Sequence, residues 1–314
     1  MSQLSPTALK YLDNYAEAEA RALLKASPAH QWNNVLVIPA YRESAELVAR
    51  LQTQLQTQAA PWEAHNNLVI LVLNQPASQT VDHNRDLRDT LMTLSRSETT
   101  GAGSLYQLCP EADVLLLERN EGLPDAEGVG LARKMGCDCA LALQQSGRIG
   151  SRWIHTTDAD VTLPADYFHC AETIHEHVAI SHPFEHSPPT EPGLAAALAV
   201  YDLRLRYYVY GLNAAGSPYA FHTLGSCISV DADSYASVRG FPRRAGGEDF
   251  YLLNKLAKLG AIASPSGPQI TIHGRRSDRV PFGTGPAITK LMAEGYTEGN
   301  AADTALGKTD LARL

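Results

Sequence analysis

The chain has 314 residues, of which 44% are hydrophobic, and its formal net charge at pH 7 is −8. This length and hydrophobic content suffice for one large domain or two small ones with a sizeable core, as in an ordinary globular protein. The acidic balance, without a dense cluster of Lys and Arg, argues against a nucleic-acid-binding protein, although phosphates can still bind locally.

The N-terminal segment predicts a helix. Residues 7–25 carry apolar side chains at helical spacing, and Ser27-Pro28 follows them. This period predicts an amphipathic helix that ends at the proline. We expect an N-terminal helical extension over residues 1–30 whose role is packing. The remainder, residues 31–314, shows no repeat and no convincing linker, which predicts a single domain.

Short apolar runs then alternate with segments of helical period. The apolar runs are 35–40, 68–73, 114–119 and 153–159. The helical segments between them are 44–57, 82–96 and 125–136. Runs that are apolar at every position and separated by helices are typical of a parallel sheet covered on both faces. The predicted fold class is therefore α/β, with a mostly parallel sheet flanked by helices.

Polar or conformationally special residues follow the first three predicted strands. They are Pro39, Ala40, Tyr41 and Glu43 after the first, Asn74 after the second and Asn120 after the third. Ligands of parallel sheets bind at the carboxyl ends of the strands. We therefore expect one cleft to gather these residues.

The character of the chain changes after residue 178. A Pro-rich loop is followed by a predicted long helix over 194–212 and by a Gly/Pro loop near 215–218. This change divides the domain into a first half, residues 31–178, and an elaborated C-terminal half, residues 179–314.

The fourth predicted strand ends in Asp158-Ala159-Asp160. Residues two apart in an extended chain point the same way, so the two carboxylates would share one site. A hard divalent cation relieves their repulsion most easily, which makes the pair a candidate Mg²⁺ or Mn²⁺ site. The same tripeptide recurs at Asp231-Ala232-Asp233, where we expect Asp233 to N-cap a short helix. For the first copy, the residues alone leave both the metal role and a structural role open.

Two later features carry candidate site residues. Glu248-Asp249 opens a predicted helix, where acids are favoured by the positive end of the helix, so capping is the plain interpretation. His273 follows the last apolar strand, and a lone histidine is usually a structural or surface group. Arg275, Arg276 and Arg279 come next, either as a loop that closes over phosphates or as a solvated basic loop.

Four segments, in this order, resemble motifs of GT-A-fold glycosyltransferases, most similar to the family 2 group that uses nucleotide-diphosphate sugars. They are VLVIPAYRES, RNEGLPDAEGVGLARKMG, WIHTTDADV and GSCISVDADSYASVRGFPRRAGGEDFYLLNKLAKLG. Together they cover roughly residues 33–262. The resemblance implies a GT-A fold whose first half binds the nucleotide-sugar and whose second half binds the acceptor.

The resemblance also implies roles for residues on the nucleotide-sugar side. Tyr41 and Glu43 match positions that seat the base and ribose, and Arg133 lies in the second motif. Asp158 and Asp160 match the acids that hold the metal and the sugar-diphosphate, so Mg²⁺ or Mn²⁺ is the implied cofactor.

The same likeness implies roles near the acceptor. Asp249 matches the catalytic base of an inverting transfer, and Glu248 is expected to contact the acceptor or a loop. A late histidine often completes the metal shell in such enzymes, which makes His273 the implied third ligand. Arg276 and Arg279 are then expected to contact the diphosphate of the nucleotide-sugar.

One position departs from the family pattern. The second strand in the family usually ends in Asp-Asp-Gly-Ser, whose first acid contacts the base, whereas this chain has Leu73-Asn74-Gln75-Pro76. An amide both donates and accepts where a carboxylate only accepts, so Asn74 leaves the base preference open and uridine is not assumed.

Other functions remain as alternatives. One is a retaining GT-A transferase acting on a small acid such as glycerate or phosphoglycerate, which EGVGLARKMG and the residues after His273 faintly resemble. Another is a sugar nucleotidyltransferase, disfavoured because no glycine follows the first strand. A non-catalytic GT-A-like binding module is the third. The donor sugar, the acceptor and the oligomeric state stay open.

The location of the protein is predicted from two absences in the sequence. No apolar leader precedes the first helix, and the most apolar later segment is broken by Asp202, Arg204 and Arg206, so we expect neither secretion nor a membrane span. The five cysteines show neither zinc nor disulfide spacing. This pattern predicts reduced thiols and a cytoplasmic protein.

Overall fold

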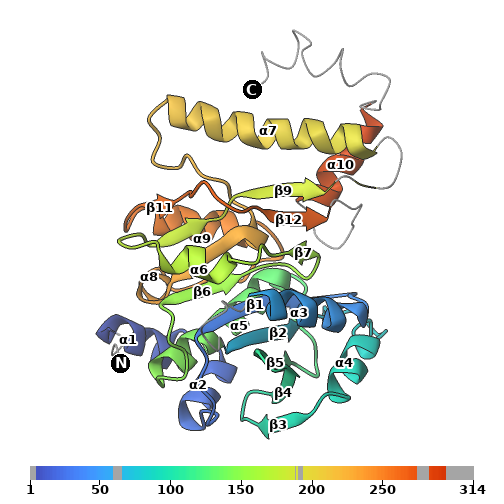
Figure 1. Cartoon of the computed structure of the whole chain (residues 1–314), viewed down its shortest axis with the longest axis vertical. Coiled ribbons are helices and arrows are strands. Elements are labelled where there is room, and N and C mark those ends of the chain that lie inside the picture. Colours follow the sequence, from blue (N-terminus) through green and yellow to red (C-terminus); the bar gives the residue numbers. More distant parts are fainter. Residues whose placement is uncertain (1–4, 59–65, 188, 190–193, 274–282, 295–314) are drawn as a thin grey trace.

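A nine-stranded sheet forms the centre of the protein, in the order β11-β8-β10-β6-β1-β2-β5-β4-β3 (Figure 1). The structure, a computed structural model, describes residues 5–58, 66–187, 189, 194–273 and 283–294. The strands of this sheet are β1 Asn34–Ala40, β2 Asn67–Leu73, β3 Arg96–Thr99, β4 Ser104–Cys109, β5 Ala112–Glu118, β6 Trp153–Thr156, β8 Ala179–Ser181, β10 Ile228–Asp231 and β11 Ile262–Ala263.

Most strands of the sheet point the same way. β1 pairs in parallel with β2 and β6, and β2 pairs in parallel with β5. Only β10 and β4 run against these strands, since each pairs antiparallel with both of its neighbours. The predicted α/β class with a mostly parallel sheet is therefore confirmed.

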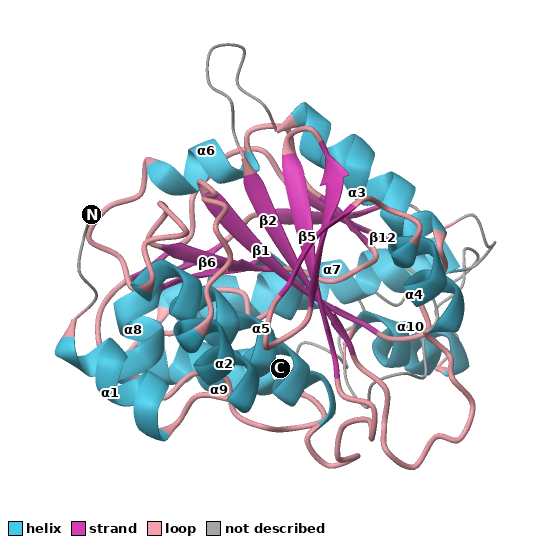
Figure 2. Cartoon of the chain, turned by 90° about the horizontal axis from the view of Figure 1, so that it is seen from below, coloured by secondary structure: helices cyan, strands magenta, loops and turns pink. Residues whose placement is uncertain are grey.

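Helices cover both faces of the sheet (Figure 2). One face carries α3 Glu46–Thr57, α4 Arg85–Met92 and α6 Tyr167–Glu172. The other face carries α1 Pro6–Asn14, α2 Ala18–Lys25, α5 Gly128–Gln145, α8 Ala232–Ser237 and α9 Glu248–Leu256. The alternation of β1 explains why two layers are needed: Val35 and Val37 pack in one core, whereas Leu36 and Ile38 pack in the other.

The N-terminal extension consists of two helices rather than the single helix predicted over residues 7–25. The chain turns at Glu17, whose backbone is extended and whose amide donates to Asp138 Oδ2 at 2.9 Å. Asp138 is fully buried, and its Oδ1 also accepts from the hydroxyls of Tyr11 and Tyr235. In a continuous helix, the Glu17 amide would donate to a backbone carbonyl one turn earlier. Here it donates to the Asp138 carboxylate, so the helix is interrupted at Glu17.

Helix α5 is longer than the predicted segment 125–136, because Gly136 lies inside it instead of ending it. A Cβ at Gly136 would lie 2.3 Å from Val37 Cγ1. The glycine therefore allows the helix to approach the sheet closely. The hairpin of β3 and β4 was not predicted, because its first strand is largely exposed and has no apolar pattern.

A smaller unit lies beyond the carboxyl ends of the parallel strands (Figure 1). It contains a three-stranded sheet, β7 Val161–Thr162, β12 Ile270–His273 and β9 Phe184–Ser187, with α7 Leu194–Ala214 and α10 Thr284–Ala293 above it. The first two turns of α7 pack on α10 through a small apolar core. The buried residues of α7 end at Val200, so most of this long helix is not packed into a core.

No helix within the described ranges has both the length and the apolar character needed to cross a membrane. The five cysteines are free thiols, and four of them are buried.

Candidate functional site

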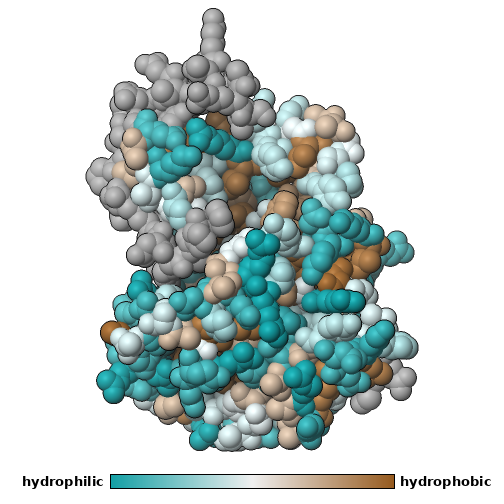
Figure 3. Space-filling view, turned by 180° about the vertical axis from the view of Figure 1, so that it is seen from behind, coloured by the Kyte–Doolittle hydropathy of each residue, from teal (hydrophilic) through white to brown (hydrophobic). Residues whose placement is uncertain are grey.

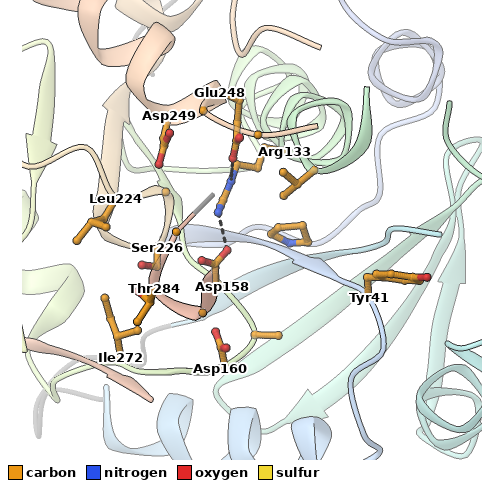
Figure 4. A pocket seen from close by; sticks show the side chains of 18 of the residues that line it. Tyr41, Arg133, Asp158, Asp160, Leu224, Ser226, Glu248, Asp249, Ile272 and Thr284 are labelled. Carbon is orange, nitrogen blue, oxygen red and sulfur yellow. Dashed lines mark hydrogen bonds and ion pairs between the residues drawn. The ribbon is translucent and has the colours of Figure 1, made fainter. Parts of the chain in front are cut away.

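A cleft of ≈ 430 Å³ lies between the central sheet and the smaller unit (Figure 4). Its floor comes from the carboxyl ends of β1, β2 and β6, and its walls come from α7, α9 and the start of α10. The predicted site residues that it gathers are Pro39, Tyr41, Glu43, Asn74, Arg133, Asp158, Asp160, Glu248, Asp249 and His273. Four separate sequence motifs thus meet at the edge where ligands of parallel sheets bind.

Tyr41 lies directly after β1, and its ring is held from two sides. The Arg42 guanidinium lies 5.1 Å from the ring centroid, and His83 meets the ring edge-on at 6.0 Å. Arg42 has a left-handed backbone, with φ 57°, and its amide donates to Asn84 Oδ1 at 3.2 Å. A left-handed backbone is uncommon in a non-glycine residue, but Glu176 and Arg239, which do not line the cleft, also have it. Sequence reasoning missed His83 and Asn84, because only the fold brings the segment before α4 to Tyr41.

Two predicted residues do not face the cleft. Ala40 is fully buried inside β1. Asn120 is exposed in the turn after β5 and is not part of the cleft lining. Its neighbour Arg119 is bound instead to Glu17 and Glu19 of the N-terminal extension, with the Nη2 and Nε atoms at 3.0 and 2.7 Å. The expectation that the third strand end joins the cleft is therefore not met.

The first Asp-Ala-Asp is not part of an extended strand, because β6 ends at Thr156 and the chain turns at residues 159–160. The carboxylate of Asp158 accepts a hydrogen bond from the guanidinium of Arg133 (Figure 4). Strand alternation is thus not what brings the two acids to the cleft. The charge of Asp158 is offset in part by Arg133, a cation from α5.

Arg133 joins three parts of the site. Besides Asp158, its Nε donates to Glu248 Oε1 at 2.9 Å and its Nη1 donates to Thr156 Oγ1 at 2.7 Å. Burial by itself lowers the pKa of Arg133, but the charges of Asp158 and Glu248 raise this pKa above its ordinary value. The side chain is only 3% exposed. Arg133 therefore stays charged, and its side chain links α5 to the end of β6 and to α9.

The Arg133 guanidinium has room at this position because residue 225 is a glycine. A Cβ at Gly225 would lie 2.6 Å from Arg133 Nη2, where no side-chain carbon fits. Gly130, one turn before Arg133 in α5, has a related role: a Cβ there would meet the carbonyl oxygens of Pro242 and Arg244 at 2.5 and 2.6 Å. The loop before α9 can therefore pack directly on α5, which sets the position of Glu248.

Replacing Arg133 with Met is expected to lower the free energy of unfolding by about 3–5 kcal/mol, because the buried carboxylate of Glu248 would lose its charged partner. The measurement is urea-induced unfolding at pH 7. The matched control is Arg152→Met, which removes an ion pair with Asp231 whose arginine side chain is 44% exposed. That change should cost about 0–1 kcal/mol. Equal losses for the two variants would contradict the linking role of Arg133.

Glu248 and Asp249 form the first turn of α9, yet neither caps it in the predicted way. The N-cap position is Gly247, which has φ 71° and supplies no side chain. The Glu248 side chain is 6% exposed, is paired with Arg133 and belongs to the lining of the cleft. Asp249 Oδ1 accepts from the amide of Phe250 at 2.7 Å, and the Asp249 side chain lines the cleft.

Asp249 is suited to proton transfer near neutral pH. Burial, followed by the negative charge of Glu248, raises the pKa of Asp249 to about 6. The amide of Phe250 and the charge of Arg133 act in the opposite direction but do not cancel this effect. A carboxylate with such a pKa is ionised at pH 7 and is a stronger base than an ordinary aspartate.

Asp158 and Asp160 supply two carboxylates for a hard cation but not a complete set of ligands. Among the described residues, no three His, Cys, Asp or Glu side chains lie close enough together to hold a metal ion. His273 lines the cleft, but its Nε2 and Nδ1 hydrogen-bond to the hydroxyls of Thr162 and Ser187 at 3.0 and 3.1 Å. A ligand role would require the ring to leave one of them. Mg²⁺ and similar ions often bind through one or two carboxylates plus substrate phosphates, and Asp158 and Asp160 fit that arrangement.

The second Asp-Ala-Asp has structural contacts and does not belong to the cleft lining. Asp231 is the N-cap of α8, because its Oδ1 accepts from the amide of Ser234 at 2.9 Å. The expectation that Asp233 caps this helix is wrong. Asp233 instead accepts from the Ser5 hydroxyl at 2.7 Å and so ties α1 to α8.

A set of contacts at the rim was not visible in the sequence. His186 of β9 forms two hydrogen bonds: its Nδ1 lies 2.7 Å from Asp202 Oδ1, and its Nε2 lies 3.2 Å from the Thr284 hydroxyl. These contacts fix Thr284, which lines the cleft, between β9 and α7. Arg275, Arg276 and Arg279 lie outside the described residues.

Comparison with known proteins finds similarity among solved structures. No family model matches the chain, and no curated protein matches it. Among solved structures, the chain is similar to glucosyl-3-phosphoglycerate synthase from Mycobacterium tuberculosis in complex with Mn²⁺, uridine diphosphate and glucosyl-3-phosphoglycerate. The similarity covers 87% of this chain and 80% of that chain, with 14% sequence identity and a TM-score of 0.45. A similarity this low does not assign a function to the chain.

Proposed function

We propose that the chain is a metal-dependent glycosyltransferase that moves a sugar from a nucleotide-diphosphate sugar to an acceptor hydroxyl, with inversion at C1. The observation that carries the proposal is the Asp249 carboxylate, whose pKa of about 6 suits a base, in one cleft with Asp158 and Asp160. A base and a pair of acids placed for a diphosphate are the two parts that this chemistry needs.

The nucleoside end of the donor is assigned to the carboxyl ends of β1 and β2. Tyr41 offers an aromatic ring, and its contacts with Arg42 and His83 keep that ring in place. Glu43 and Asn74 line the same part of the cleft and offer hydrogen-bonding groups. Because Asn74 both donates and accepts, the proposal does not specify uridine.

The diphosphate end is assigned to Asp158 and Asp160, which would hold Mg²⁺ or Mn²⁺ together with the phosphate oxygens. When bound, such an ion supplies Lewis-acid stabilisation of the departing diphosphate. Arg133 holds the Asp158 carboxylate in place through a hydrogen bond (Figure 4). Arg133 is a positioning residue in this scheme, because its guanidinium is already engaged by Asp158, Glu248 and Thr156.

The proposed transfer is a single displacement at C1 of the sugar. The acceptor O–H bond breaks as its proton moves to the Asp249 carboxylate, and the acceptor oxygen forms a bond to C1 of the sugar. The bond between C1 and the phosphate oxygen breaks on the opposite side, and the nucleoside diphosphate leaves. Since the pKa of Asp249 is about 6, this carboxylate is ionised at pH 7 before the acceptor arrives.

The test of this proposal is a thermal-shift screen of nucleotide-diphosphate sugars with uracil, guanine, adenine or thymine bases, each with and without Mn²⁺. At least one donor should raise the melting temperature only when Mn²⁺ is present. A ligand at about 100 times its Kd adds about 2.7 kcal/mol to the free energy of unfolding. Mn²⁺ alone and nucleoside monophosphates are the controls. No Mn²⁺-dependent shift with any donor would contradict the proposal.

A further inference from the structure

A second, apolar pocket of ≈ 230 Å³ lies between α7 and α9. Its α7 side is formed by Leu205, Tyr208, Val209 and Leu212, which follow one another at helical spacing on one face. Its α9 side is formed by Phe250 and Asn254, which are four residues apart. The proposed transfer mechanism uses none of these side chains.

This apolar pocket is a continuation of the cleft. Leu205 and Thr223 line both spaces. Along α9, Asp249 faces the cleft and the next residue, Phe250, faces the apolar pocket. The loop before η1 Gly225–Cys227 does the same, since His222 lines the pocket and Leu224 lines the cleft. Residues of three chain segments, α7, α9 and this loop, therefore line both spaces.

The two connected spaces differ in charge. The cleft lining contains Asp158, Asp160, Glu248 and Asp249. The described residues that line the apolar pocket include no Asp, Glu, Lys or Arg. Burial lowers the pKa of His222, so its ring is neutral at pH 7. An ionic group would lose hydration in this pocket without finding a partner, which disfavours a charged occupant.

Four of the eleven described residues that line the apolar pocket are Tyr or Phe. They are Tyr208, Tyr219, Phe221 and Phe250. Tyr208 is 62% exposed and Phe250 is 46% exposed, although both belong to a concave part of the surface. The hollow below the top of the molecule, which carries α7, shows hydrophobic surface (Figure 3). Rings held at such a site gain about 0.5–1.5 kcal/mol from edge or offset contact with another ring.

The size of the apolar pocket also limits its role. Complete sites for small molecules are typically about 300–1,000 Å³, so ≈ 230 Å³ suits one group of a ligand whose remaining atoms lie elsewhere. The adjoining cleft is the place for those atoms. A ligand with an uncharged ring in the pocket and a hydroxyl beside Asp249 would satisfy both spaces at once.

We infer that the apolar pocket is the acceptor subsite and that the acceptor is an uncharged alcohol bearing an aryl group. This inference rests on the proposed function and adds the class of acceptor to it. The aryl ring contacts Tyr208 and Phe250, while the hydroxyl reaches Asp249 and attacks C1 of the donor sugar as described above. The acidic surroundings of the cleft act against an anionic acceptor such as a small carboxylic acid.

Binding is tested first, with 3-phenylpropan-1-ol as the probe. Saturation-transfer difference NMR should show transfer from the protein to the phenyl protons, and less transfer to the chain protons beside the hydroxyl. The variant Val209→Trp fills the pocket and should remove this signal. A wild-type protein that gives no signal at millimolar probe would overturn the inference.

Transfer is tested next with a matched pair on α7. Tyr208 lines the apolar pocket, whereas Tyr210 is similarly exposed, at 70%, and is not part of the lining. With the donor found in the thermal-shift screen, Tyr208→Ser should lower kcat/KM for the aryl alcohol about tenfold. Tyr210→Ser should change it less than twofold. Phe250→Ala and Tyr251→Ala give a second pair on α9, because only Phe250 lines the pocket.

The acceptor series distinguishes this inference from its competitors. Wild-type protein should prefer 3-phenylpropan-1-ol over 1-hexanol, glycerol and D-glycerate. Faster transfer to D-glycerate or glycerol, a preference for 1-hexanol, or equal effects of Tyr208→Ser and Tyr210→Ser would each overturn the aryl assignment. So would binding of the aryl alcohol without transfer when the donor is bound. The proposed function fails separately, through the absence of any Mn²⁺-dependent donor shift.

Discussion

Replacing Asp249 with Asn is expected to lower the rate of sugar transfer by about 10²- to 10⁴-fold, with nucleotide-sugar affinity nearly unchanged. An amide of the same shape fills the same space in the first turn of α9 but cannot accept the proton of the acceptor. The rate should be measured as transfer to an alcohol, because hydrolysis of the donor by water depends less on the base and would mask the loss.

The same variant should fold at least as stably as the wild type at pH 7. Asn Oδ1 can still accept from the Phe250 amide, and the N-cap is Gly247, so no cap is lost. The pKa of Asp249 is raised to about 6, which means that the folded state holds its proton more tightly than the unfolded state. The cost of ionisation therefore builds up between the ordinary pKa of 3.8 and about 6 and is constant at higher pH, and the neutral amide removes this cost. Urea unfolding at pH 7 and at pH 5 measures the difference.

The pH dependence of transfer gives an independent check. A base has to be ionised, so kcat/KM should fall tenfold per pH unit below about 6 and level off above it. The residual activity of Asp249→Asn should lack this acidic limb. The matched control is Asp233→Asn, which changes another acid in the first turn of a helix, away from the cleft. Retention of more than about a tenth of wild-type transfer would remove Asp249 from the mechanism and favour a retaining reaction.

The second large effect is expected at the first Asp-Ala-Asp. Asp160→Asn should abolish the Mn²⁺-dependent part of the thermal shift produced by the donor, because loss of one ligand charge weakens a hard-cation site severely. Transfer should be lost with it. The shift is measured directly on the folded protein, so the result does not depend on finding the acceptor.

Asp158→Asn is expected to have a second effect. Asp158 accepts from Arg133, so its replacement also removes one of the two carboxylates that offset this buried cation. We therefore expect loss of the Mn²⁺-dependent shift together with a lower melting temperature of the free protein.

The chain contains its own control for these two variants. Asp231→Asn changes the matching residue of the second Asp-Ala-Asp, and Asn caps a helix about as well as Asp. Donor binding and transfer should therefore be unaffected. Full Mn²⁺-dependent binding by Asp160→Asn, or equal loss in Asp231→Asn, would reverse the assignment of the two copies.

Local patterns were sufficient for several features of this protein. The apolar runs that became β1, β2 and β5 are buried at every position or nearly so, and that burial is what makes a strand between two helical layers recognisable. Tyr41, Asn74 and Asp158 were assigned to strand ends, and they do share the cleft. Such predictions succeed because strand direction places all carboxyl ends of parallel neighbours at one edge.

Predictions failed where a distant group competes with a local preference. The helical period over residues 7–25 is continuous, but Asp138 draws the Glu17 amide away and splits the helix. Gly136 has the character of a helix end, but close packing on Val37 requires it inside α5. Local propensity is worth a few tenths of a kcal/mol per residue, so one buried carboxylate or one close contact outweighs it.

The sequence by itself determined the α/β class, the parallel strands β1, β2, β5 and β6, and which acids follow them. Only the tertiary structure decided what those acids do. Arg133 lies 25 residues from Asp158 and 115 residues from Glu248 along the chain, and the fold alone joins the three. The pKa of Asp249 depends on burial and on Glu248, and the apolar pocket exists only because α7 and α9 face each other. Electrostatic and packing energies depend on distance in space, which the order of residues does not contain.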